Sequence, residues 1–142
     1  MTSCMEAGTH SSIKYYQYNV SKQDLEKALQ HVIISSNTIH QDRMKDYYND
    51  DTTYVTINIA YGKIFNNYIF RYGGNKDYWD TSKKSSISIA YAHNKDGEGG
   101  SAGNGGVEWY NYKLKAELVE PFEKELISKI DNELGMKHID SE

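Results

Sequence analysis

Oxygen-bearing side chains alternate where a glycine-rich stretch begins in the second half of the chain. Asn94, Asp96 and Glu98 match the first three ligand positions of an EF-hand-like calcium loop, and a glycine follows them as that loop requires. The position of the bidentate glutamate falls on Gly105, however, and no helical pattern leads in. Calcium needs about six to eight oxygen ligands, so only half of the motif is present. We predict no cofactor, keep Ca²⁺ at these three residues as the alternative, and expect residues 94–106 to form a long, mobile hairpin connection.

Other signatures of catalytic chemistry are missing from the sequence. The histidines are scattered, none has the HExxH spacing of a zinc site, and no GxSxG nucleophile elbow occurs. The carboxylate pairs Asp50/Asp51 and Asp77/Asp80 fall in polar connections, where such pairs are more often solvated than catalytic. We predict that the protein is not an enzyme, with an enzyme of unrecognised type as the alternative.

Tyrosine is the strongest compositional anomaly, with 13 residues in a chain of 142. A domain of this size cannot bury all of them, and Tyr and Trp are enriched at protein interfaces. Several lie beside carboxylates, which suits a basic partner. The predicted partner-binding residues are Tyr47, Tyr48, Asp50, Asp51, Tyr78, Trp79 and Asp80. The competing explanation is a composition bias toward Tyr and Asn, such as an AT-rich genome produces.

Cys4 is the only cysteine, so no intrachain disulfide can form. It follows Thr2 and Ser3 as in the tail of a lipobox, and a small, polar stretch separates it from the first apolar pattern. Mature bacterial lipoproteins begin in this way, with a lipid-carrying cysteine and a tether. We predict lipidation at Cys4 and a flexible tether over residues 1–12, with an ordinary free thiol in a frayed terminus as the alternative.

Two amphipathic helices are expected to position these groups. Ser21 has the properties of a helix N-cap, and a stripe of apolar residues at every third or fourth position follows it. Near the C-terminus an apolar stripe over residues 118–134 repeats every four residues, and Gly135 ends it. Pro121 conflicts with an interior helical position, so we place it in the first turn, where its missing N–H is not needed.

Alternating patterns between the helices predict strands. Val55, Ile57 and Ile59 are expected on the face that meets the helices, while the residues between them face outward, with Tyr78 and Trp79 at the rim. Ile87, Ile89 and Tyr91 alternate in the same way and are expected to share one face. The predicted strands are a short edge strand over residues 13–18 and strands over residues 54–59, 68–72, 87–91 and 107–113.

The length and the charge of the chain limit its fold class and the kinds of partner it can bind. At 142 residues and 16.3 kDa it fits one domain. A formal net charge of -4 opposes nucleic-acid binding or direct binding to an anionic membrane. We predict an α+β fold, in which a three- to four-stranded antiparallel meander sheet carries an N-terminal and a C-terminal helix on one face. The domain is expected over residues 13–135, and residues 136–142 are expected to be a disordered tail.

The layout resembles small, uncharacterised lipoproteins of Gram-negative bacteria. A tethered cysteine precedes the segments SIKYYQYNVSKQDLEKAL, YVTINIAYGKIFNNYIFRYGGNKDYW and GGSAGNGGVEWYNYKL, so the resemblance covers nearly the whole chain after Cys4. Many such lipoproteins are envelope components or immunity proteins that neutralise a neighbouring toxin, and no catalytic motif is carried over. The resemblance implies a non-enzymatic, envelope-anchored protein that faces the periplasm or lies at the surface and meets the membrane only through its lipid. Its partner would be a basic toxin or an envelope component. The alternative function is a glycan- or small-molecule-binding module with Trp79 and Trp109 as stacking platforms.

Overall fold

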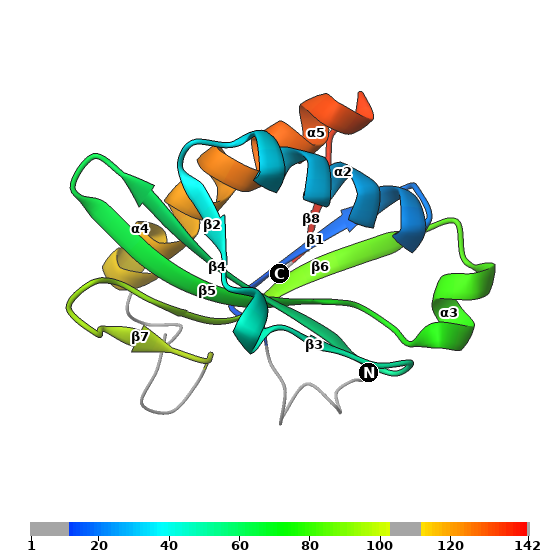
Figure 1. Cartoon of the computed structure of the whole chain (residues 1–142), viewed down its shortest axis with the longest axis horizontal. Helices are drawn as coiled ribbons and strands as arrows, with labels where there is room; N and C mark the ends of the chain where they lie inside the picture. Colours follow the sequence, from blue (N-terminus) through cyan, green and yellow to red (C-terminus); the bar gives the residue numbers. More distant parts are fainter. Residues whose placement is uncertain (1–11, 103–111, 142) are drawn as a thin grey trace.

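The computed structural model describes residues 12–102 and 112–141 of the chain (Figure 1). The strands are β1 (Lys14–Tyr18), β2 (Ile39–Gln41), β3 (Tyr47–Tyr48), β4 (Thr53–Tyr61), β5 (Ile64–Tyr72), β6 (Ser85–His93), β7 (Gly99–Gly100) and β8 (Ile139–Ser141). The helices are α2 (Lys22–Ser35), α3 (Lys76–Thr81), α4 (Tyr112–Phe122) and α5 (Ser128–Leu134), with a 3-10 turn η1 (Arg43–Lys45) and a π-helical segment η2 (Glu123–Ile127).

The strands form one antiparallel sheet in the order β2-β4-β5-β6-β1-β8, with β3 also paired to β4 and β7 to β6. Strands β4, β5 and β6 make the expected meander. The predicted α+β class with an antiparallel sheet is therefore confirmed, although the sheet has more strands than the three to four expected.

The C-terminal residues correct two of the predictions. Residues 139–141 form β8, which pairs antiparallel with β1, so a disordered tail over residues 136–142 is wrong for this part. Strand β1 in turn is no edge strand, because it lies between β6 and β8. The tail has too few residues for a periodic signal, and its pairing with a strand more than 100 residues away depends on the tertiary fold.

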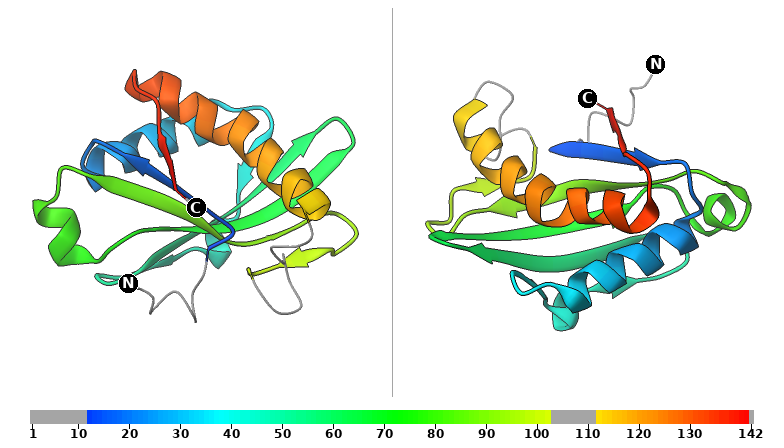
Figure 2. Two further views of the ribbon diagram at one scale, coloured as in Figure 1. Left: turned by 180° about the vertical axis from the view of Figure 1, so that it is seen from behind. Right: turned by 90° about the horizontal axis from the view of Figure 1, so that it is seen from above.

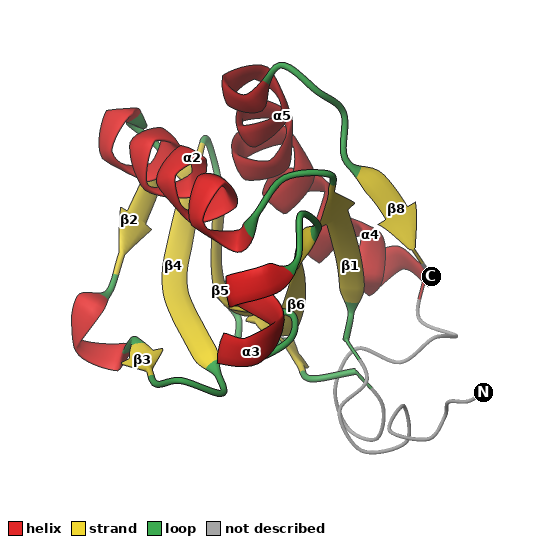
Figure 3. Ribbon diagram, turned by 90° about the vertical axis from the view of Figure 1, so that its right-hand side faces the viewer, coloured by secondary structure: helices red, strands yellow, loops and turns green. Residues whose placement is uncertain are grey.

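Helices α2 and α5 lie side by side on one face of the sheet, as predicted (Figures 2 and 3). Ser21 caps α2, since its hydroxyl accepts a hydrogen bond from the backbone N–H of Asp24 at 3.1 Å. The apolar stripe of α2 and the predicted helix-facing residues of β4 are buried against each other in one core. Phe122 from the C-terminal helix lies at its centre, with its ring 5.0 Å from that of Tyr68.

An irregularity in β6 changes which side chains reach this core. The pairing register with β5 shifts by one residue at Ala90. Ile89, before the shift, is buried, whereas Tyr91, after it, is 40% exposed and Ala92 is buried instead. The expectation that Tyr91 shares a face with Ile89 is therefore wrong, because the extra residue reverses the alternation.

Pro121 lies inside α4, and its predicted first-turn position is wrong. Its missing N–H leaves the carbonyl of Glu117 without a helical donor. The side-chain amide of Asn66 donates to that carbonyl at 3.4 Å, and the hydroxyl of Tyr68 donates to the carbonyl of Leu118 at 2.7 Å. Asn66 thus offers a long hydrogen bond to the carbonyl that Pro121 leaves without its helical donor, Tyr68 adds a second bond from the sheet to the helix, and the π-helical segment η2 follows at once.

Part of the expected strand over residues 107–113 lies outside the described residues. Where the structure resumes, Tyr112 and Lys113 begin α4 and are not in a strand. The aromatic alternation in that segment is compatible with either element over so few residues.

A partly buried polar network holds β8 in place. His138 lies between two carboxylates, with Nδ1 2.8 Å from Asp131 Oδ2 and Nε2 3.0 Å from Asp140 Oδ1. The hydroxyl of Tyr18 donates to the other oxygen of Asp131 at 2.8 Å. On the same strand, Lys14 and Tyr16 both bond to Glu123 Oε2, at 2.9 and 2.8 Å. The C-terminal network is defined as Lys14, Tyr16, Tyr18, Glu123, Asp131, His138 and Asp140.

The tyrosines of the C-terminal network are held in the neutral form. Burial raises the pKa of Tyr16 far above its ordinary value, and the charge of Glu123 raises it further. Burial and the hydrogen bond to Asp131 act in the same direction on the pKa of Tyr18. Both phenols therefore serve as hydrogen-bond donors to carboxylates, which ties β1 to the C-terminal helices.

Candidate functional site

A break in the edge of the sheet positions the predicted partner-binding tyrosines. Strands β2 and β3 both pair with β4, and η1 separates them, so the backbone N–H of Thr56 has no strand partner there. Asp46 Oδ1 accepts that hydrogen bond at 2.7 Å, while Oδ2 accepts from the amide of Gln41 at 2.5 Å and from the hydroxyl of Tyr48 at 3.2 Å. Burial, reinforced by the Asp46 carboxylate, raises the pKa of Tyr48. Asp46 thus fixes where β3 begins.

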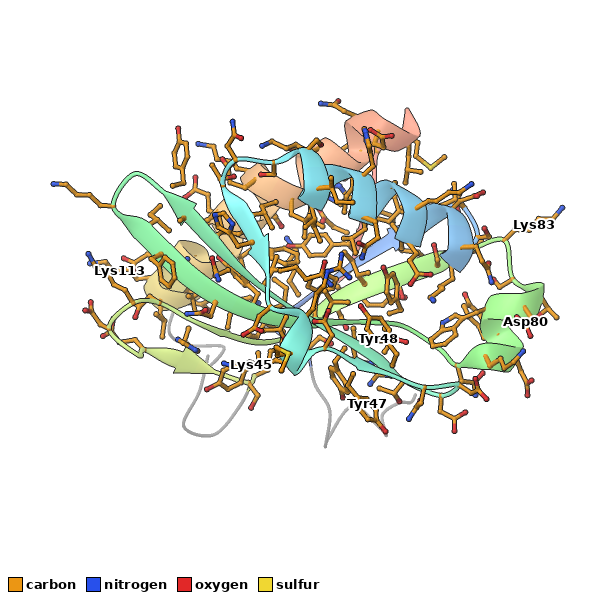
Figure 4. All side chains as sticks on the ribbon, in the orientation of Figure 1. Lys45, Tyr47, Tyr48, Asp80, Lys83 and Lys113 are labelled. Carbon is orange, nitrogen blue, oxygen red and sulfur yellow. The ribbon has the colours of Figure 1, made fainter. Side chains whose placement is uncertain are left out.

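Tyr47 and Tyr48 point to opposite sides of the sheet (Figure 4). Tyr47 pairs with Tyr54 on the outward face, whereas Tyr48 pairs with Thr53, which is buried on the helix side. Both rings remain about half exposed, at 53% and 52%. The two predicted tyrosines therefore each present a half-exposed ring, one on either face of β3.

The turn between β3 and β4 exposes two carboxylates to solvent. Asn49 closes this turn, because its side-chain oxygen accepts from the backbone N–H groups of Asp51 and Thr52 at 2.8 and 2.7 Å. Asp50 and Asp51 are exposed, and neither forms an ion pair with another described residue. The turn is held by its backbone and by Asn49, which leaves both carboxylates available.

Helix α3 joins this turn to the other predicted segment. The backbone N–H of Lys76 donates to the carbonyl of Asp50 at 2.6 Å, and Asn75 caps the helix through the N–H of Tyr78. Lys76 Nζ lies 2.8 Å from Asp80 Oδ2, and this hydrogen bond raises the pKa of Lys76. The structure thus brings two loops that lie far apart in sequence to one place. We define the acidic end as Tyr47, Tyr48, Asp50, Asp51, Asp77, Tyr78 and Asp80.

Trp79 corrects the prediction of an exposed partner-binding ring. It is only 7% exposed and belongs to the core, and its indole N–H donates to the carbonyl of Gly73 at 2.6 Å. The ammonium group of Lys22 lies 4.7 Å from its ring and covers it from the side of α2. In the short helix α3, Tyr78 faces solvent at 43% exposure while its neighbour turns inward. Trp79 is therefore a packing residue that holds α3 against the domain.

The outward face of the sheet adjoins the acidic end and includes residues that the sequence did not single out. Arg71 lies opposite Tyr54, with its guanidinium 5.9 Å from the tyrosine ring. Tyr54 and Asn58 are partly exposed there, as expected. Thr56 was expected outward too, yet it is 8% exposed because η1 covers it. Side chains alternate along β5, so Arg71 lies on the face opposite to the buried Phe70. This alternation could have identified Arg71 from the sequence.

The candidate calcium residues form a tight turn that closes on itself. The side-chain oxygen of Asn94 accepts from the backbone N–H groups of Asp96 and Glu98 at 2.9 and 3.0 Å, and its amide donates to the Glu98 carboxylate at 2.9 Å. Strand β7 then pairs back on β6, so the first part of the expected mobile connection is a hairpin. No group of metal-binding His, Cys, Asp or Glu residues occurs in the described part of the chain. The prediction of no cofactor and its calcium alternative at this turn both stay untested.

Several predicted features fall outside the part of the chain that the structure describes. They are the lipidation site Cys4, almost all of the tether over residues 1–12, and Trp109 of the alternative glycan platform. Among the described helices, none combines the length and the apolar character needed to cross a membrane.

Comparisons of the chain with protein-family models, with curated proteins and with solved structures give no match.

Proposed function

We propose that the protein is a non-enzymatic binding protein of the bacterial cell envelope, anchored through a lipid on Cys4, whose acidic end binds a basic protein partner. Its sharpest form is an immunity or inhibitor protein that covers the basic active site of a toxin. The observation that carries the proposal is the hydrogen bond from Lys76 N–H to the carbonyl of Asp50, which unites two acidic, aromatic segments.

The chemistry of the acidic end supports a partner rich in Lys and Arg. Asp50, Asp51 and Asp77 are exposed and form no ion pair with any described residue, although the charges of Asp50 and Asp77 add to the rise in the pKa of the neighbouring Lys76. All three carboxylates are therefore accessible to an incoming cation. The rings of Tyr47 and Tyr78 lie beside them, and such rings attract guanidinium groups while burying a large area at low entropic cost. Charge complementarity of this kind speeds association and selects the partner.

The test is capture of partners from the native host by the full-length protein, followed by mass spectrometry. The variant Asp50→Asn/Asp51→Asn changes the net charge from -4 to -2 at the acidic end. The matched control, Asp96→Asn/Glu120→Gln, makes the same change at the far end of the sheet. We expect a basic protein that the wild type and the control retain and the acidic-end variant loses. Equal retention by all three proteins, or retention of acidic proteins only, would contradict the proposal.

Anchoring is tested separately through Cys4. Metabolic labelling with a clickable fatty acid should label the wild type and leave Cys4→Ser unlabelled. Equal labelling of both would exclude the lipid anchor, while the role of the acidic end would remain open to the capture experiment.

A further inference from the structure

A pocket of about 240 Å³ lies at the opposite end of the molecule from α3. Three segments line it: residues 63–66 at the β4–β5 hairpin, residues 94–96 at the turn after β6, and Glu117, Glu120 and Pro121 of α4. In Figure 1 these segments are the hairpin tip, the neighbouring turn and the helix between them. Drug-sized ligands occupy pockets of about 300–1,000 Å³, so this pocket suits a smaller molecule.

The charges around this pocket are unpaired and of both signs. Lys63 and Lys95 extend from the two strand connections, while Glu117 and Glu120 lie three residues apart on α4. None of these four side chains forms an ion pair with another described residue. Lysines and glutamates from different elements thus line the same pocket with no ion pair between them. Asp96, beside Lys95, adds a third carboxylate at the rim.

A second groove, between α2 and α5, shows the contrast. Its lining includes Glu133 and Lys129, but the first is paired with His31 at 2.9 Å and the second with Glu125 at 3.5 Å. These two charged groups therefore already have partners within the protein, whereas the charged side chains that line the pocket at the β4–β5 hairpin are exposed, of both signs and without an ion pair to another described residue.

Pro121 also affects a carbonyl of a pocket-lining residue. The carbonyl of Glu117 loses its helical donor because Pro121 has no N–H, and its bond from the amide of Asn66 is long, at 3.4 Å. Asn66, Glu117 and Pro121 all line the pocket. Phe65 and Ile64, exposed at 43% and 39%, supply the apolar side.

We propose that this pocket binds a small zwitterion with an apolar side chain, of the class of a free α-amino acid. The ammonium group of the ligand lies toward Glu117 and Glu120, its carboxylate toward Lys63 and Lys95, and its apolar side chain on Phe65. The ligand supplies the opposite charges that the protein leaves unmatched, and each end of the ligand is recognised by a different element. This proposal does not depend on the proposed partner at the acidic end.

The test is a titration of the ¹⁵N-labelled full chain with L-leucine, followed by amide chemical shifts. We expect saturable shifts at residues 63–66 and 94–96 below about 20 mM, the range of weak small-molecule binding. N-acetyl-L-leucine lacks the ammonium group and L-leucinamide lacks the carboxylate, and each should bind about tenfold more weakly, as expected for loss of one charged hydrogen-bonding group.

Paired variants assign each end of the ligand. Glu117→Gln/Glu120→Gln should weaken L-leucine binding about tenfold and leave N-acetyl-L-leucine unaffected, while Lys63→Gln/Lys95→Gln should weaken L-leucine and leave L-leucinamide unaffected. The control Asp50→Asn/Asp51→Asn, at the acidic end, should bind L-leucine as the wild type does. Shifts that do not saturate, equal binding of the capped analogues, or L-leucine binding unchanged in both paired variants would each overturn the proposal.

Discussion

The C-terminal network and the acidic end use carboxylates in opposite ways. In the C-terminal network, Glu123 and Asp131 each accept hydrogen bonds from two partners, and the side chain of His138 is only 11% exposed. At the acidic end, Asp50 and Asp51 are exposed and form no ion pair with described residues. Buried charges must be matched within the fold, whereas exposed charges contribute little to stability. The first region therefore holds the fold together, and the second leaves exposed the charges that our proposal assigns to a partner.

Alkaline pH should lower the free energy of unfolding through the buried tyrosines, and this is the largest effect that we expect. Burial raises the pKa values of Tyr16, Tyr18, Tyr68 and Tyr72 above 10.0 in the folded chain. Their stabilising contribution is complete below pH 10 and is lost as the pH rises further, because the unfolded tyrosines release protons that the folded ones keep. Four tyrosines give a loss of about 5 kcal/mol per pH unit above pH 10. Urea unfolding between pH 8 and pH 11 measures this slope, and a flat profile would contradict it.

Trp79→Ala tests the aromatic residue that was predicted to be exposed with the partner-binding residues and that the structure buries in the core. Its ring packs in the core and its N–H is bonded to Gly73, so the substitution should lower the free energy of unfolding by about 3–5 kcal/mol. Tyr78→Ala, next to it on the exposed side of α3, should change stability by less than about 1 kcal/mol. Thermal unfolding of both variants gives the comparison, and equal, small effects would place Trp79 outside the core.

His138→Ala should weaken the C-terminal network by leaving Asp131 and Asp140 without their shared partner. We expect a loss of about 1–2 kcal/mol in the free energy of unfolding, as for the loss of hydrogen bonds to charged groups that are partly exposed and keep Tyr18 and Lys14 as partners. His31→Ala is the matched control, since its pair with Glu133 is 64% and 38% exposed and contributes less than about 1 kcal/mol. Hydrogen exchange should also show earlier opening of β8 in the first variant only.

Local signals explain why part of this fold was predictable. Ser21 and the apolar stripe of α2 lie within one helix, and the alternation of Val55, Ile57 and Ile59 lies within one strand, so neighbouring residues contain the information. Gly135 ends the C-terminal helix in the left-handed conformation that its position predicts. These elements follow from residue type and spacing alone.

The features that the sequence did not reveal depend on contacts between distant segments. Strand β8 needs β1, and Asn66 and Tyr68 from β5 donate to the carbonyls of Glu117 and Leu118 in the turn of α4 that precedes Pro121. The candidate site shows the same division. The residue types of the acidic end were predictable, but the contact between Lys76 and Asp50, and the burial of Trp79, required the fold.

Two Tyr→Phe substitutions compare a buried hydroxyl that has a hydrogen-bond partner with one that has none among the described residues. The hydroxyl of Tyr18 donates to Asp131, so Tyr18→Phe should destabilise the protein by about 1 kcal/mol or more. The buried hydroxyl of Tyr72 has no hydrogen-bond partner among the described residues, so Tyr72→Phe should stabilise the protein by about 1 kcal/mol. Chemical denaturation at pH 7 should give opposite signs, and destabilisation of equal size in both would contradict the assignment.

Asp50→Asn/Asp51→Asn should have the smallest effect on stability, within about 0.5 kcal/mol. The turn is held by Asn49 and its backbone, and removing two of several neighbouring negative charges relieves repulsion. Any gain should therefore appear at low salt and vanish near 1 M salt, where the screening length falls to about 3 Å. Asp46→Asn is the control, since that carboxylate accepts three hydrogen bonds and its loss should cost about 1–3 kcal/mol. Urea unfolding at both salt concentrations compares the variants. A loss above 1 kcal/mol in the Asp50/Asp51 variant would mean that these carboxylates support the fold, and the acidic end would then resemble the C-terminal network.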